Sequence, residues 1–292
     1  MQIIRAIDMG FCFGVRRAIV MMEQAAQEQP RIDSLGAVVH NPQVVDRLNS
    51  QGVQVVKNID DITSTSVAIT AHGVGPHIIE ELEKKGLAVL DTTCPIVERS
   101  QIAAKKLVED GFLVVVYGNS DHPETRGVLG WAGGNGIATT DQDFLKGYKH
   151  APKKIGILAQ TTQVPAHFTD FVKHIMDQAL EEVTEIRVVN TLCNATSAQQ
   201  EAAMALAVQV QLMIVVGGRN SANTRHLAEL CTSAGVETYH IERADEVDSS
   251  WLVGKDRVGI TAGASTPDEA IDAVVQRVEN ISKTLEAASV SK

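Results

Sequence analysis

The feature that most constrains the fold of this chain is an internal repeat that occurs three times. Each copy has a cysteine that is followed 28 residues later by a polar loop residue, in the pairs Cys12 and His40, Cys94 and His122, and Cys193 and Ser221. Further along each copy, an apolar run passes through alanine into polar residues and then proline, in the segments ITAHGVGP, ILAQTTQVP and ITAGASTP. A repeat of this size is an architectural unit, so we expect three similar modules.

Each copy also carries the same order of predicted elements. First strands are expected at residues 36–39, 112–117 and 212–216, helices at 44–48, 125–129 and 224–230, and second strands at 53–56, 136–139 and 236–241. Between helix and second strand stand Gly52, Gly133 and Gly235, where glycine is the expected helix stop. A strand, a helix and a strand with short connections indicate a parallel sheet.

The predicted fold class is therefore α/β, with three similar α/β modules of short parallel sheets around a pseudo-threefold axis. The expected modules span residues 13–95, 96–190 and 191–281, with an N-terminal strand over 1–12 and a C-terminal tail over 282–292. A length of 292 residues by itself suggests about two domains. The repeat instead divides the chain into three units near the small end of domain size.

Composition excludes several classes of function. Hydrophobic residues make up 44% and charged residues 21%, as in an ordinary globular protein, and 26 basic against 36 acidic side chains leave a net charge of −10. That charge argues against non-specific binding of nucleic acid. The N-terminal residues lack a secretory leader pattern, and no apolar stretch is long enough for a bilayer. We therefore expect a cytoplasmic protein that has no membrane partner.

The repeat predicts a common role for three of the cysteines, which isolated cysteines would not indicate. Equivalent positions in three modules around one axis would bring Cys12, Cys94 and Cys193 to a common point. A lone cysteine in a core is usually a small apolar residue, and Cys231, which has no counterpart in the other copies, is predicted to serve packing alone. In a reducing compartment, a related set of cysteines more often binds metal or acts in catalysis than forms disulfides.

The number of cysteines indicates which metal centre they would hold. Tetrahedral zinc with three cysteines needs a fourth ligand and usually shows a close C-x-x-C pair, whereas these cysteines are separated by 82 and 99 residues. A 4Fe-4S cluster held by three thiolates would leave one iron without a protein ligand, able to bind a substrate oxygen as a Lewis acid. We therefore predict one 4Fe-4S cluster at the centre of the three modules.

Polar loops are expected at the carboxyl ends of the strands, where helix N-termini can bind anions. Their hydrogen-bond donors suit a phosphate or a diphosphate: His40, Asn41, His72, Gly73, His122, Thr161, Thr162, Ser221, Asn223, Ser265 and Thr266. Several of these residues precede prolines, where turn and N-cap chemistry alone favours small polar side chains. The presence of three of the nine histidines in corresponding loops favours a binding role.

Glu124 is the acidic residue with the clearest candidate role. Pro123 sets a helix start and places this carboxyl group in the first turn, where it would complement the helix dipole in a purely structural role. In a closed, poorly hydrated site its pKa would rise, and the protonated acid would deliver a proton to a leaving hydroxyl. Thr161 could complete a short proton relay.

Taken together, these motifs resemble the LytB family of 4-hydroxy-3-methylbut-2-enyl diphosphate reductases, over nearly the whole chain. The segments that carry the resemblance are, in chain order, GFCFGV, VHNPQVV, TAHGV, DTTCP, DHPE, QTT, TLCNAT, NSAN and TAGAS. The order and number of these motifs make the resemblance specific, whereas any one of them would be weak.

The resemblance implies a trefoil of three α/β domains around a 4Fe-4S cluster held by Cys12, Cys94 and Cys193. It implies reductive dehydration of the allylic diphosphate to isopentenyl and dimethylallyl diphosphate, the last step of the non-mevalonate isoprenoid pathway. The catalytic residues would be Glu124, Thr161 and His122. The diphosphate would be bound by His40, His72, His122, Ser221, Asn223 and Ser265. Ala222 is a departure, because many relatives have a second serine there, so only its backbone N–H would bind phosphate.

The electrons require an external source. The chain has no G-x-G-x-x-G segment between a strand and a helix, which a dinucleotide cofactor would need, and the resemblance implies ferredoxin or flavodoxin as donor. Two alternatives of other classes remain. One is an aconitase-like iron-sulfur hydro-lyase acting on a small anion, which would turn over without a reductant. The other is a non-enzymatic diphosphate-binding or iron-sensing protein, which would release no product.

Overall fold

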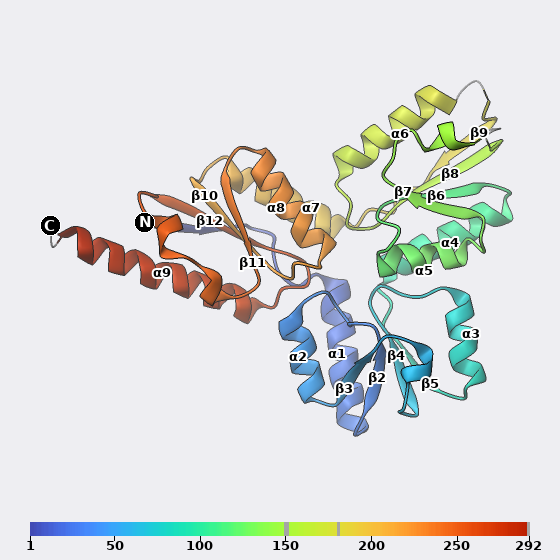
Figure 1. Ribbon diagram of the computed structural model, residues 1–292, viewed down its shortest axis with the longest axis horizontal. Coiled ribbons are helices and arrows are strands. Elements are labelled where there is room, and N and C mark those ends of the chain that lie inside the picture. Colours follow the sequence, from blue (N-terminus) through green and yellow to red (C-terminus); the bar gives the residue numbers. More distant parts are fainter. Residues whose placement is uncertain (149–151, 180–181, 291–292) are drawn as a thin grey trace. The chain divides into compact units, whose positions relative to one another are not determined.

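The computed structural model describes residues 1–148, 152–179 and 182–290, which contain three four-stranded sheets (Figure 1). The first sheet has the order β3-β2-β4-β5 and the second β7-β6-β8-β9. The third has the order β11-β10-β12-β1, and every strand pair in the three sheets is parallel. The predicted α/β class with three similar modules is confirmed.

The strand bounds show how the repeat maps onto the sheets. In the first sheet they are β2 (Ile32–Leu35), β3 (Val53–Val56), β4 (Ser66–Ile69) and β5 (Ala88–Asp91). In the second they are β6 (Leu113–Tyr117), β7 (Gly136–Thr139), β8 (Lys154–Ala159) and β9 (Glu185–Val188). In the third they are β10 (Leu212–Val216), β11 (Glu237–Ile241), β12 (Arg257–Ala262) and β1 (Gln2–Arg5). The N-terminal strand therefore occupies the edge position that β5 and β9 occupy in the other sheets.

Nine α-helices lie among the described residues. Their bounds are α1 (Phe13–Glu28), α2 (Pro42–Ser50), α3 (Pro76–Lys84), α4 (Pro95–Glu109), α5 (Pro123–Trp131), α6 (Pro165–Ala179), α7 (Asn194–Ala207), α8 (Ala222–Ser233) and α9 (Asp268–Val290). Five of them begin at a proline, whose fixed φ and missing N–H suit the first helical position. Among the described residues, no helix is long and apolar enough to cross a membrane.

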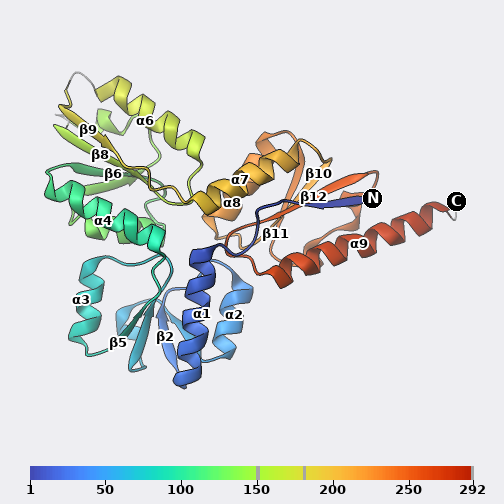
Figure 2. The ribbon, with the colours of Figure 1, turned by 180° about the vertical axis from the view of Figure 1, so that it is seen from behind.

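Each sheet is covered on its faces by helices, following the period-two alternation of strands. In the second sheet, Val115 and Tyr117 pack with Phe168 and Phe171 of α6, whereas the alternate residues of β6 pack with α4 and α5. In the third sheet, α9 covers one face and α7 and α8 cover the other (Figure 2). Cys231 is fully buried beneath this second face, so its predicted packing role is confirmed.

The chain forms two compact units. One comprises Met1–Val15, His40–Val44 and Asn194–Lys292, with the third sheet, and the other comprises Arg16–Val39 and Val45–Cys193, with the first two sheets. The three module boundaries expected from the sequence remain a proposal. β1 covers only part of the expected strand over residues 1–12, and α9 continues into the expected tail from residue 282.

Most predicted elements are confirmed, and one strand is wrong. The strand expected at residues 36–39 lies earlier, at β2, because Gly36 has a φ of +90° that ends the strand. Asp33 and Ser34 gave β2 a polar appearance, yet both are fully buried. The Asp33 carboxylate accepts hydrogen bonds from the backbone N–H groups of Thr63 and Ser64 at 2.7 and 2.9 Å, which compensates for its burial.

Candidate active site

The three predicted cysteine ligands occupy equivalent places in the three sheets. Cys12 lies between β1 and α1, Cys94 between β5 and α4, and Cys193 between β9 and α7. The backbone N–H of each cysteine donates to the loop after the neighbouring strand, with acceptors and distances Ala264 O at 3.2 Å, Ala71 O at 3.0 Å and Thr161 O at 2.9 Å. All three side chains are partly exposed, and all four cysteines of the described chain are thiols. The repeat therefore sets the same backbone environment three times.

Cys94 and Cys193 belong to the same compact unit, and Cys193 contributes to the shifted pKa of the Cys94 thiol. Burial is the main reason that the pKa of the Cys94 thiol is raised. The charges of Cys193 and Glu124 raise it further, while the backbone N–H groups of Ile96 and Val97 oppose the shift. A cationic metal centre would reverse this balance, because it favours the thiolate. Cys12 lies in the other unit.

Glu124 and Thr161 form a buried hydrogen-bonded pair. Glu124 is 3% exposed, in the first turn of α5. The Thr161 N–H donates to Oε1 at 2.6 Å, and the Thr161 hydroxyl contacts Oε2 at 2.8 Å. Burial raises the pKa of Glu124 to about 7. The two hydrogen bonds from Thr161 lower the pKa, but the effect of burial is larger. Since the carbonyl of Thr161 also accepts from the Cys193 N–H, this residue joins the carboxyl group to a cysteine loop.

His122 and His72 lie beside this pair in the same unit. His122 Nδ1 accepts from the Glu124 N–H at 3.2 Å, so this histidine caps α5. The His72 ring meets the His122 ring edge-on, with centroids 5.5 Å apart, and its Nδ1 lies 3.3 Å from the Thr70 hydroxyl. The structure thus brings together His72, His122, Glu124 and Thr161, which the sequence separates by up to 89 residues.

A second group of predicted residues lies in the other unit, at the carboxyl ends of β10 and β12. The Ser265 hydroxyl donates to the His40 carbonyl at 3.4 Å. Close approach of this loop requires Gly218, because a Cβ there would lie 2.2 Å from the His40 carbonyl oxygen. Burial, and the nearby Arg225 guanidinium, lower the pKa of His40. His40 is therefore neutral at pH 7.

Ser221, Ala222 and Asn223 begin α8 in this second group, and all three are buried. The Ser221 hydroxyl accepts from the Thr224 N–H at 3.3 Å and so caps the helix. Asn41 caps α2 in the same way, since its Oδ1 accepts from the Val44 N–H at 3.2 Å. The capping explanation of these polar residues is therefore correct, and it leaves a binding role open because the first N–H groups of a helix still lack intrahelical partners.

Sequence reasoning missed two buried glutamines that support these groups. Gln199 accepts from the Asn223 amide at 2.9 Å and donates to the Gly10 carbonyl at 2.8 Å. Gln160 accepts from the Asn119 N–H at 3.2 Å and donates to the Thr162 hydroxyl at 3.1 Å. The only signal for Gln160 was its place in the second repeated segment, and nothing in the sequence distinguishes Gln199 from its neighbour Gln200.

The raised pKa of Glu124 predicts a loss of stability with rising pH. Its carboxyl group keeps its proton to about pH 7 in the folded metal-free chain and releases it near 4.5 when unfolded. The unfolding free energy should therefore fall between these values, by on the order of 3 kcal/mol at about 1.4 kcal/mol per pKa unit. Glu124→Gln, whose amide can satisfy both Thr161 groups, should lack this fall. Urea unfolding of both chains at several pH values measures the free energy of unfolding. The same dependence on pH in both chains would contradict the raised pKa.

These features define a class of protein: a three-module α/β chain in which a cysteine precedes a helix in every module and polar loops follow the central strands. The chain belongs to the LytB family, matching the family described as "LytB protein" over residues 3–279. The family predicted from the sequence motifs is therefore confirmed.

Several named proteins are similar to this chain. A protein of Dehalococcoides mccartyi named 4-hydroxy-3-methylbut-2-enyl diphosphate reductase is 50% identical, covering 97% of this chain and 99% of its own. The protein of that name from Geobacter metallireducens is 43% identical, with coverages of 96% and 98%. A solved structure described as that reductase, the terminal enzyme of the non-mevalonate pathway, is 40% identical, covers 96% of this chain and 100% of its own, and has a TM-score of 0.69.

A more distant solved structure, described as E-1-hydroxy-2-methyl-but-2-enyl-4-diphosphate reductase from Plasmodium falciparum, is similar in fold. It is 23% identical, covers 94% of this chain and 86% of its own, and has a TM-score of 0.87. At this identity the likeness shows the fold alone.

Proposed function

We propose that this chain catalyses the reductive dehydration of 4-hydroxy-3-methylbut-2-enyl diphosphate to isopentenyl diphosphate and dimethylallyl diphosphate. The reaction takes up two electrons and two protons and releases the allylic hydroxyl as water. Membership of the LytB family and the names of its relatives support the substrate. The single observation that carries the proposal is the buried Glu124–Thr161 pair, a proton source at neutral pH that is tied through Thr161 to the Cys193 loop.

The cofactor of this proposal is one 4Fe-4S cluster on Cys12, Cys94 and Cys193, at the centre of a trefoil of the three modules. Three partly exposed thiols with equivalent backbone environments fit a ligand set contributed once by each module. When bound, such a cluster supplies electrons and one iron without a protein ligand that acts as a Lewis acid. The recurring hydrogen bond from each cysteine N–H restrains the loop and favours a defined position for each sulfur.

The diphosphate is bound, in this proposal, by the polar loops at the ends of the strands. His40, Ser221, Asn223 and Ser265 come from one unit and His72 and His122 from the other. The loops lead into the N-termini of α2, α5 and α8, where backbone N–H groups favour anions. Ala222 is the first residue of α8 and offers a backbone N–H in place of a hydroxyl.

The geometry of Glu124 suggests the route of the proton. Oε1 accepts from the Thr161 N–H and so acts only as an acceptor, which places the acid proton on Oε2. The Thr161 hydroxyl donates to Oε2 of the ionised carboxylate at 2.8 Å. When Oε2 carries the acid proton, this hydrogen bond reverses, and the Thr161 hydroxyl passes its own hydrogen to the departing substrate hydroxyl. Because the pKa of Glu124 is about 7, a large fraction of the acid carries its proton at neutral pH.

We further propose that a small redox protein such as ferredoxin or flavodoxin supplies the electrons, and that the enzyme is cytoplasmic. The sequence has no fingerprint of a bound dinucleotide. Because the net charge is −10 and such donors are themselves acidic, association would require a local basic patch.

Turnover with and without a reductant tests the proposed function. The anaerobically reconstituted chain is incubated with the allylic diphosphate and a reduced electron donor, and diphosphate products and donor oxidation are measured together. We expect both isoprenyl diphosphates to form, with two electrons consumed per product and no turnover when the donor is omitted. Turnover without a donor would favour the hydro-lyase alternative, and binding without any product would favour a sensor.

A further inference from the structure

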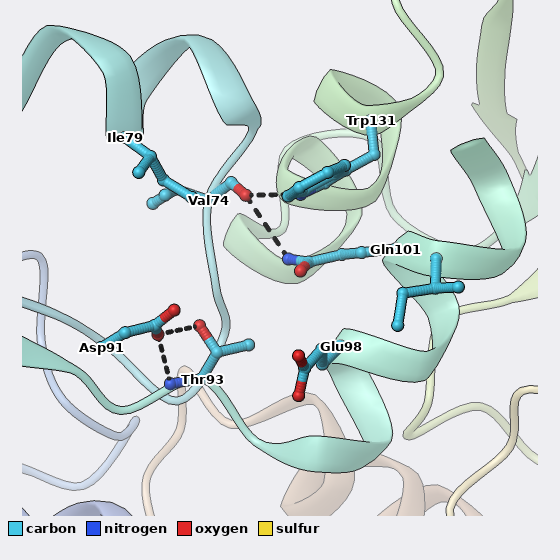
Figure 3. A pocket seen from close by; sticks show the side chains of 8 residues that line it. Val74, Ile79, Asp91, Thr93, Glu98, Gln101 and Trp131 are labelled. Atoms are coloured by element: carbon cyan, nitrogen blue, oxygen red, sulfur yellow. Dashed lines mark hydrogen bonds between the residues drawn. The ribbon is translucent and has the colours of Figure 1, made fainter.

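A cavity of about 210 Å³ lies within the unit that contains the first two sheets. None of the residues assigned to the proposed reaction lines it, although Thr93 directly precedes Cys94 in the chain. Figure 3 shows the side chains that line it, which come from the loop between β4 and α3, from the end of β5 and the loop after it, and from α3, α4 and α5. They are Val74, Ile79, Asp91, Thr93, Glu98, Gln101, Ile102 and Trp131. The cavity combines two carboxylates with an indole and aliphatic side chains.

The hydrogen-bond donors around this cavity are already used by the protein. The Trp131 indole N–H donates to the Val74 carbonyl at 3.0 Å. The Thr93 N–H donates to Asp91 Oδ1 at 2.8 Å, and the Thr93 hydroxyl donates to the same oxygen. The polar groups left to face a ligand are therefore acceptors, chiefly the Glu98 carboxylate, the second oxygen of Asp91 and the Gln101 side chain.

Gln101 is the most informative of these acceptors. Its side chain is only 5% exposed, and its amide nitrogen contacts the Val74 carbonyl at 3.4 Å. If the amide were turned over, its oxygen would lie against the Val74 carbonyl oxygen, and two acceptors would face each other. The orientation of the amide is therefore determined, and Oε1 points into the cavity (Figure 3). No donor among the described residues satisfies this oxygen. The oxygen therefore faces the cavity without a protein donor, and water or a donor group from outside the chain can bind it.

The two carboxylates that line the cavity are not neutralised by a cation of the described chain. Asp91 and Glu98 are both exposed at the mouth of the cavity, and neither forms an ion pair with any residue that the structure describes. Two cations lie nearby, but each has other partners: Arg17 donates to the Thr93 carbonyl at 3.1 Å, and Lys105 lies 5.9 Å from the Trp131 ring centre and 3.9 Å from Glu109. The cavity thus presents two carboxylates and an amide oxygen beside an aromatic side chain.

We propose that this cavity binds a guanidinium group. A guanidinium ion is planar, has five N–H donors and is weakly hydrated, so it can meet several acceptors at once while contacting an indole and aliphatic carbons. An ammonium ion is a compact, strongly hydrated charge that gains less from apolar walls. Two sources share this chemistry, a small free guanidine and an arginine side chain of a protein partner. The inference does not depend on the proposed reductase activity.

The test is calorimetric titration of the full-length, anaerobically reconstituted chain with n-butylguanidinium and with n-butylurea, which has the same shape without the charge. We expect the guanidinium compound to bind at least about tenfold more tightly, because bonds to a charged partner are the stronger ones. Glu98→Gln should weaken its binding at least about tenfold. Glu109→Gln, on the same helix and outside the cavity, should leave binding within about twofold and serves as the matched control.

Equal binding of the urea and the guanidinium would overturn the proposal, and so would wild-type affinity in both Glu98→Gln and a second variant, Asp91→Asn. Stronger binding of Mg²⁺ or K⁺, with displacement of butylguanidinium, would also overturn it in favour of a metal site. Agmatine and a blocked Gly-Arg-Gly peptide distinguish the sources, since the tighter binder identifies a free guanidine or a protein arginine. Glu98→Gln should keep turnover, so a failed reductase assay and a failed titration are separate results.

Discussion

Glu124→Gln is expected to lower turnover by about 10²- to 10⁴-fold, the usual contribution of a positioned general acid. The amide has the same shape and can keep both contacts with Thr161, which now lie at 2.6 and 2.8 Å, but it has no acid proton to deliver. The measurement is the anaerobic rate of product formation at saturating substrate and reductant. Iron content should remain that of the wild type, since Glu124 is not among the proposed ligands.

The control for this variant is Glu109→Gln, which changes an exposed carboxylate at the end of α4 and should keep the wild-type rate. In the wild type, the rate should fall as the pH rises through about 7, because the pKa of Glu124 is raised to that value and only the protonated acid can donate. The variant should lack this fall. A Glu124→Gln chain with near-normal turnover would remove Glu124 from the proton role.

Replacing any one of Cys12, Cys94 and Cys193 by serine is expected to abolish the cluster and all turnover. The wild-type chain, reconstituted anaerobically with iron and sulfide, should hold about four irons per chain. Each serine variant should lose most of its iron and sulfide, because a three-thiolate ligand set has no spare protein ligand. The measurement is metal and sulfide analysis with the visible absorption spectrum of each purified chain.

Cys231→Ser is the matched control for the cysteine series. Cys231 is fully buried, and burial raises the pKa of its thiol to about 11, so it stays a neutral thiol. Its variant should keep the iron and the spectrum of the wild type. If the wild-type chain instead binds about one zinc or no metal, or keeps its iron in all four variants, the proposed cluster and the reductase mechanism that needs it both fail.

Much of the fold was accessible from the sequence, because local patterns report local structure. The second strands β3 and β7 begin and end at the predicted residues, and β10 does as well. Gly52, Gly133 and Gly235 adopt the positive φ expected of glycines that end helices. The strand β2 was misplaced for a reason that no local pattern reveals: the backbone N–H groups of Thr63 and Ser64, about thirty residues away, make Asp33 tolerable inside a strand.

The residues of the candidate site were also predictable only in part. The sequence singled out Glu124 at a helix start and Thr161 in a repeated segment, and the structure places them in direct contact. Gln199 and Gln101 were missed, because a glutamine becomes informative only when its burial and its partners are known. The cavity beside Gln101 likewise joins residues of α3, which packs on the first sheet, with residues of α4 and α5, which pack on the second, and no spacing in the sequence predicts it.

By itself, the sequence determined the threefold repeat, the α/β class and the family, because recurring residues at constant offsets reflect recurring supersecondary units. Tertiary structure alone decided that β1 completes the third sheet, that the Cys193 loop and Glu124 meet through Thr161, and that an amide oxygen faces an acidic cavity. The physical reason is the distance along the chain over which each kind of interaction acts. Periodicity and capping act over a few residues, whereas desolvation and hydrogen-bond pairing of buried groups depend on whichever distant segments the folded chain brings beside them.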